Sequence, residues 1–203
     1  MNKQLWWYVA RSGGIVAWAL LAGSVLWGLA LSTKVLRGRP RPNWILDLHR
    51  FLGGLALLFT GIHVTGLVLD SYVHFGLTEV LVPFASAWHP VAVAWGVVGL
   101  YLLVAVELTS LARKKISKRA WRLTHYLSFP LFLLTTVHAL SAGTDRSTFL
   151  LRWSVIIVSA AITGLTLVRL DKADRHDLLT SPDSKSAQQR RVLSGSSQGS
   201  ARR

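Results

Sequence analysis

Four histidines lie inside long apolar stretches of the chain, in two pairs of nearly equal spacing. His49 and His63 are 14 residues apart on one stretch, and His125 and His138 are 13 residues apart on another. Histidine is uncommon in a membrane helix because lipid offers its ring nitrogens no hydrogen-bonding partner. Two hemes, each held from both sides by histidine, would satisfy all four rings. The spacing therefore predicts a shared ligand at each of two depths.

The elements that must position these histidines are long apolar runs. Each run has about the ~20 residues that a helix needs to cross ~30 Å of hydrocarbon. None shows the strict alternation of a barrel strand. The chain has 203 residues, of which 51% are hydrophobic and 16% charged, and its apolar runs cover roughly 12–32, 45–70, 90–111, 121–143 and 148–169. We expect an all-α polytopic membrane bundle of about five transmembrane helices over 1–170, and a disordered basic cytoplasmic tail over 171–203.

The helix count fixes the relative depth of the histidines. Runs two and four are separated by one helix, so they cross the membrane in the same direction. His49 and His125 therefore share one depth, and His63 and His138 share another. At 1.5 Å per residue the two depths are ~20 Å apart along the helix axes. Two stacked cofactors would bridge most of the hydrocarbon layer.

Positions around an ideal helix favour a shared face for His49 and His63 more than for His125 and His138. Fourteen steps of 100° bring His63 within ~40° of His49 on the helix surface, whereas thirteen steps leave His138 ~140° from His125. Pro130 lies between the latter two histidines and permits a kink, because it removes a backbone hydrogen bond.

The net charge of +14 could indicate a nucleic-acid partner, but its placement indicates a membrane protein without one. Residues 70–89 contain no Lys or Arg, and 141–148 contain only Arg146. This alternation predicts an N-terminus outside and a C-terminus in the cytoplasm, in the inner (plasma) membrane, with the basic loops at anionic headgroups. The loops after runs one and three carry the positive charge: Lys34, Arg37, Arg39, Arg41, Arg113, Lys114, Lys115, Lys118, Arg119 and Arg122.

The absence of cysteine narrows the possible redox chemistry. Without cysteine, thiolate-ligated and covalently attached hemes and iron–sulfur clusters are excluded. Met1 is the only methionine, so Met-ligated heme is excluded as well. Histidine must carry any metal chemistry. A heme with two imidazole ligands has no open coordination position, which favours electron transfer over oxygen binding.

Two stretches around these histidines resemble the ferric reductase-like transmembrane domain, which ferric reductases, NADPH oxidases and the heme subunit of periplasmic methionine sulfoxide reductases share. The resemblance covers roughly 45–140, and it implies two b-type hemes per chain with the four histidines as axial iron ligands. The stretches that carry it are Leu48-His49-Arg50-Phe51-Leu52-Gly53 through Ile62-His63-Val64, and Trp121-Arg122-Leu123-Thr124-His125-Tyr126 through Val137-His138.

The resemblance also implies partners. The ~30 polar residues after the last run fall far below domain size, so we expect no flavin or nicotinamide domain there. The electron donor would then be a separate flavoprotein reductase or a quinol, and the acceptor ferric iron, oxygen or a periplasmic protein. The chain is expected to be an oxidoreductase component. Two alternatives are a heme-binding anchor subunit of a larger complex and a heme-free structural or transport protein.

Several other residues admit both a functional and an ordinary interpretation. Arg50 and Arg122 could pair with heme propionates or snorkel to the interface, and the same choice applies to Arg152. Glu107 could relay protons, although pairing with the basic loop is favoured. Four glycines could allow close approach of the heme macrocycles or serve plain helix packing: Gly53, Gly54, Gly61 and Gly66. His74 and His89 could bind an incoming metal ion or be ordinary surface residues.

Overall fold

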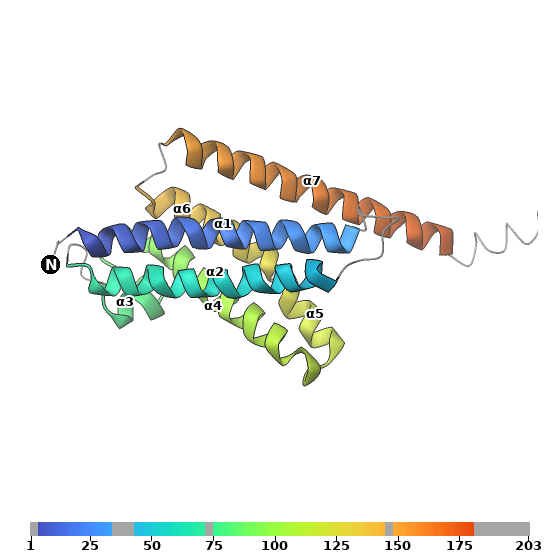
Figure 1. Cartoon of the computed structure of the whole chain (residues 1–203), viewed down its shortest axis with the longest axis horizontal. Coiled ribbons are helices and arrows are strands. Elements are labelled where there is room, and N and C mark those ends of the chain that lie inside the picture. The colour runs from blue at the N-terminus through green and yellow to red at the C-terminus, as the bar shows by residue number, and fades with distance from the viewer. Residues whose placement is uncertain (1–3, 34–42, 72–74, 145–147, 181–203) are drawn as a thin grey trace, which may run out of the picture.

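The computed structural model describes residues 4–33, 43–71, 75–144 and 148–180, and this part of the chain is helical without strands (Figure 1). Five helical segments are long and apolar enough to cross a membrane, which confirms the predicted all-α polytopic bundle. In chain order the helices are α1 (Leu5–Thr33), α2 (Asn43–Leu69), α3 (Leu77–Leu81), α4 (Pro90–Leu111), the short 3₁₀ helix η1 (Ala112–Lys114), α5 (Lys118–Tyr126), α6 (Ser128–Ala142) and α7 (Phe149–Thr180).

Helices α1 and α2 run side by side in opposite directions over most of their length (Figure 1). Small residues permit this contact. A Cβ atom added to Gly66 would lie 2.6 Å from the backbone nitrogen of Ala10, and one on Gly13 would lie 3.1 Å from the backbone nitrogen of His63. Close backbone approach at small residues is typical of membrane helix pairs, where dispersion contacts replace the hydrophobic effect.

The core lies where α1, α4 and α6 meet. Leu131 is fully buried there, and Trp18 of α1 packs against Phe132 of α6 with ring centroids 6.3 Å apart. The Trp18 indole N–H donates to the Thr136 hydroxyl at 3.0 Å. This bond is the buried polar link between α1 and α6 in the middle of the bundle.

Replacing Thr136 with valine should lower the stability of the bundle by about 1 kcal/mol, because the buried Trp18 indole loses its acceptor. Unfolding of the purified protein in detergent would measure the loss. Thr166→Val on α7 is the matched control, since in the described part of the chain that hydroxyl bonds only the carbonyl of Ile162 in its own helix. Equal loss in both variants would contradict the assignment.

The fourth apolar run is two helices rather than one. Helix α5 ends at Tyr126 and α6 begins at Ser128, and between them the Leu127 N–H bonds the Thr124 carbonyl at 3.0 Å. Pro130 explains the position of the break, because its ring collides with the carbonyl four residues earlier, at Tyr126. The sequence only permitted a kink at Pro130, and the structure shows a break at Leu127.

Helix α7 lies at the edge of the bundle, beside α1 (Figure 1). It continues to Thr180, ten residues past the predicted domain boundary at 170. No Gly or Pro occurs between Leu165 and Ser181, so nothing in the sequence stops the helix where the apolar run ends. The rest of the predicted tail, 181–203, lies outside the described residues.

The two ends of the bundle differ in charge. We call the end formed by η1 and the start of α5 the basic end, because exposed Arg113, Lys114, Lys115, Lys118, Arg119 and Arg122 gather there. The opposite end holds the start of α1, α3 and the start of α4 (Figure 1). Some residues of the predicted loops fall outside the described part of the chain: Lys34, Arg37, Arg39, Arg41, His74 and Arg146.

Candidate functional site

The structure brings the four histidines together as two facing pairs. The ring centroids of His49 and His125 are 5.9 Å apart, near the basic end, and those of His63 and His138 are 6.4 Å apart, toward the opposite end. The ring planes within each pair are nearly perpendicular, at 78° and 79°. Each pair joins α2 to the α5–α6 segment, as the helix count predicts. The break at Leu127 lets His125 and His138 both face α2 despite their 13-residue spacing.

The separation within each pair suits two imidazoles on opposite sides of one metal ion. Two metal–nitrogen bonds of ~2.0 Å and two ring radii of ~1.1 Å place such centroids ~6.2 Å apart. No hydrogen bond joins the two rings of either pair in the described structure. The pairs cannot share one ion, because the described residues contain no group of three or more metal-binding side chains.

Three of the four rings are held by backbone carbonyls of a neighbouring helix. The Nδ1 atom of His63 lies 2.6 Å from the carbonyl oxygen of Ala10, and that of His138 lies 2.7 Å from Ala92. His49 Nδ1 lies 3.0 Å from the carbonyl oxygen of Ser24 and 3.2 Å from its hydroxyl. A carbonyl can only accept, so each Nδ1 carries the hydrogen and Nε2 keeps its lone pair for a metal.

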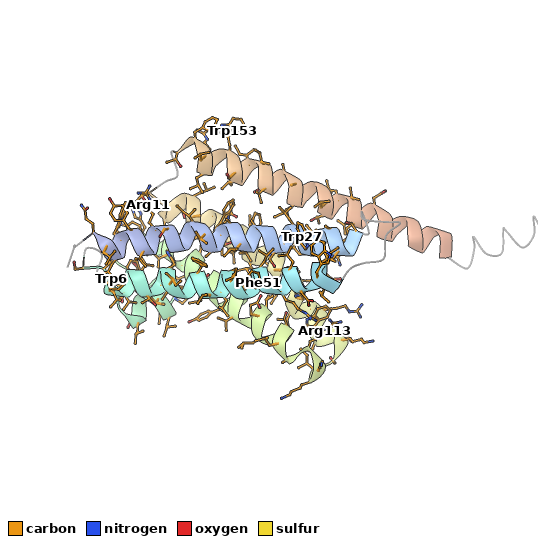
Figure 2. All side chains as sticks on the ribbon, in the orientation of Figure 1. Trp6, Arg11, Trp27, Phe51, Arg113 and Trp153 are labelled. Carbon is orange, nitrogen blue, oxygen red and sulfur yellow. The ribbon has the colours of Figure 1, made fainter. Side chains whose placement is uncertain are left out.

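His125 is oriented differently from the other three. Its ring stacks on Trp121, one turn earlier in α5, with centroids 5.1 Å apart and an interplanar angle of 21°. Its Nδ1 and the Trp121 Nε1 are buried without a hydrogen-bond partner in the described structure. Arg113 lies at the basic end (Figure 2). Its guanidinium is 4.6 Å from the Trp121 ring centroid, which is a cation–π contact. Stacking therefore replaces the carbonyl as the constraint on this ring.

Glycines on α1 and α4 make room for three of the rings. A Cβ atom added to Gly14 would lie 2.9 Å from His63 Nδ1, and one on Gly28 would lie 3.1 Å from His49 Cε1. On α4, a Cβ at Gly96 would lie 2.7 Å from His138 Cε1. Real Cβ atoms essentially never approach closer than 3.0 Å, so Gly14 and Gly96 are required for the observed ring positions.

The glycines singled out from the sequence do not contact the rings. A Cβ atom added to Gly54 or Gly61 would meet no other atom within 4 Å, Gly66 packs against Ala10, and Gly53 faces the Glu107 carboxylate. All four of these glycines lie on α2, the helix that carries His49 and His63. The important ones lie on the neighbouring helices, because those backbones face the rings.

The two arginines predicted to accompany the inner histidines are both exposed. Arg50 forms an ion pair with Asp47 at 3.5 Å, and the structure gives Arg122 no hydrogen bond or ion pair among the described residues. Their proposed role toward heme propionates stays a prediction. Arg11 and Arg113 are additional candidates. Arg11 lies at the opposite end of the bundle and directly follows Ala10, whose carbonyl holds His63 (Figure 2). Arg113 contacts Trp121, which stacks on His125. The sequence signal for Arg11 was a cation directly before the first apolar run.

The other sequence candidates have ordinary surroundings. Arg152 lines a shallow hollow on α7 with Phe149, Trp153 and Ile156. His89 caps α4 in a left-handed conformation, with φ 42° and ψ 60°, and packs edge-on against Trp88. His74, the second predicted outer histidine, lies outside the described residues.

Comparison with known proteins identifies the family of this chain. Residues 13–136, more than half of the chain, match the family described as ferric reductase like transmembrane component. No curated protein and no solved structure matches the chain. Domains of this family generally bind heme, and the family suggests electron transfer across a membrane. With five candidate spans and this match, the chain is a multi-pass membrane protein that belongs to the ferric reductase-like transmembrane family.

Proposed function

We propose that this protein carries electrons across the membrane through two b-type hemes per chain. His49 and His125 would ligate the heme at the basic end, and His63 and His138 the one at the opposite end. The observation that carries the proposal is the pairing of these rings across the bundle, 5.9 Å and 6.4 Å apart. A heme held by these histidines would supply one-electron exchange.

The protein's own residues orient the ligands and keep the interior dry. Carbonyls of Ala10, Ala92 and Ser24 fix the tautomer of three histidines. Between the two pairs, Trp18 and Phe132 fill the core. Such an apolar interior raises the cost of charge and so tunes the potential of a bound redox group.

The charge asymmetry supports an orientation. We assign the basic end to the cytoplasm and the N-terminus to the outer side of the inner membrane, following the positive-inside rule. A cytoplasmic flavoprotein or a quinol would deliver electrons near His125, and the acceptor would meet the opposite end near His63. Ferric iron, oxygen and a periplasmic protein are the candidate acceptors.

The orientation can be tested directly because the chain has no cysteine. In intact cells, a membrane-impermeant thiol reagent should label Thr78→Cys on α3 and leave Lys115→Cys unlabelled, since these exposed positions lie at opposite ends of the bundle. After the membrane is permeabilised, both should react. Labelling of Lys115→Cys in intact cells would reverse the assignment.

The function itself is tested with heme-replete purified protein. A generic flavin reductase with its nicotinamide donor should reduce both hemes, and a ferric chelate should reoxidise them. Reoxidation that occurs only with an added partner protein would favour the alternative of a heme-binding anchor subunit. A preparation without any Soret absorption would reject the proposal and favour the heme-free alternative.

A further inference from the structure

Glu107 is an acidic residue inside the membrane-spanning part of α4, and the proposed electron path does not use it. Its side chain is half-buried, and no described residue gives it a hydrogen bond or an ion pair. Ionisable residues in membrane spans are rare because they are costly there, and they mark proton or substrate paths more often than packing. The predicted pairing of Glu107 with the basic loop is wrong for the described loop residues 112–122.

The contact between Glu107 and α2 places its carboxylate near His49, which belongs to the histidine pair at the basic end. A Cβ atom on Gly53 of α2 would collide with a Glu107 carboxylate oxygen, so the carboxylate lies directly against α2. Gly53 follows His49 by four residues, which is ~6 Å along the axis and ~40° around it. The carboxylate therefore lies on the face of α2 that carries His49, about one turn farther into the membrane.

The charged groups on the elements around α4 are engaged elsewhere or lie at other depths. On α2, Arg50 pairs with Asp47 in water. At the basic end, Arg113 covers Trp121, and on α3 Glu79 accepts from the Gly76 N–H. None of the charged or titratable groups on the elements around α4 is hydrogen-bonded to Glu107 in the described structure. Besides those just named, these groups are His49 on α2, Lys114 on η1, Lys118, Arg119, Arg122 and His125 on α5, and His138 on α6.

We propose that Glu107 is a proton-binding site coupled to reduction of the heme held by His49 and His125. This inference rests on the proposed function. An electron that reaches this heme lowers the positive charge of the site by one unit. A carboxylate about one helical turn away, in a medium of low dielectric constant and without a counter-charge among the described residues, then repels the added electron, and a proton relieves the repulsion.

The step balances in charge and atoms. One electron from the flavin or quinol donor converts ferric to ferrous iron, and one proton from water at the basic end converts the Glu107 carboxylate to the carboxylic acid. Leu111, the last residue of α4, is four residues away, so the proton travels ~6 Å from the end of the helix. Transfer of the electron to the second heme reverses both changes.

Redox titration of the heme-loaded full chain at several pH values tests the proposal. One heme should become harder to reduce as pH rises, by up to tenfold in its reduction equilibrium per pH unit at the one-proton limit. In Glu107→Gln that pH dependence should shrink or vanish for this heme alone. Asp47→Asn, which removes an exposed carboxylate from the same end, should leave it unchanged.

Two outcomes would overturn the inference: a wild-type protein whose hemes are both pH-independent, and a Glu107→Gln protein with the wild-type dependence. Gly53→Ala provides a second test if Glu107→Gln loads heme poorly. The added methyl group crowds the carboxylate, so the pH at which the dependence is centred should shift, and an unchanged curve would contradict the proposal. A wild-type protein that binds no heme would instead refute the proposed function.

Discussion

Alanine at His138 is expected to remove one of two hemes per chain and to leave the other in place. Among the described histidines, the His138 ring faces only His63, at 6.4 Å, while His49 and His125 form a separate pair. His63→Ala should therefore lose the same heme as His138→Ala. His49→Ala and His125→Ala should both lose the other heme, because a b-type heme has no covalent bond to the chain and depends on its axial ligands.

Heme counted per chain, with reduced-minus-oxidised visible spectra, measures this result. The double variant His63→Ala/His138→Ala should retain one heme, whereas His63→Ala/His125→Ala should retain none. This contrast separates pairwise ligation from a general loss of folding. One heme lost in the combination of all four substitutions would refute the two-heme proposal, and so would loss of both hemes in every single variant that still folds.

Alanine at Gly96 is expected to weaken heme binding at the opposite end by about 10- to 100-fold, the range found when groups that orient metal ligands are changed. The new methyl group would lie 2.7 Å from His138 Cε1 and 2.8 Å from its Nδ1. The ring must therefore move, and it would strain or break the bond from Nδ1 to the Ala92 carbonyl. The heme at the basic end should be unaffected.

Gly164→Ala on α7 is the matched control. A Cβ atom there meets nothing within 4 Å, and the substitution removes the same backbone freedom from a membrane helix. It should bind both hemes with wild-type affinity and be slightly more stable. Heme titration of both variants, followed by Soret absorption, distinguishes them. Equal affinity in the two variants would contradict the proposed role of Gly96.

Much of this arrangement could be predicted from single residues. Pro130 permitted an interruption of the fourth run, because a missing N–H and a bulky ring act on the helix locally, and the structure places the break at Leu127. The contacts of Glu107 and Arg50 were not predictable in this way. A charged side chain in sequence has many possible partners, and only the packing of α2 against α4 selects Gly53 as the neighbour of Glu107.

By itself, the sequence determined the number of spans and the pairing of the histidines by depth. Both follow from run length and from the direction of successive helices, which are properties of the chain alone. Only the tertiary structure decided what holds each ring: the carbonyl of Ala10, the glycine at position 96, and the indole of Trp121 against His125. Carbonyls and glycines carry no side-chain signal, so their role depends entirely on which helix face is turned toward the ring.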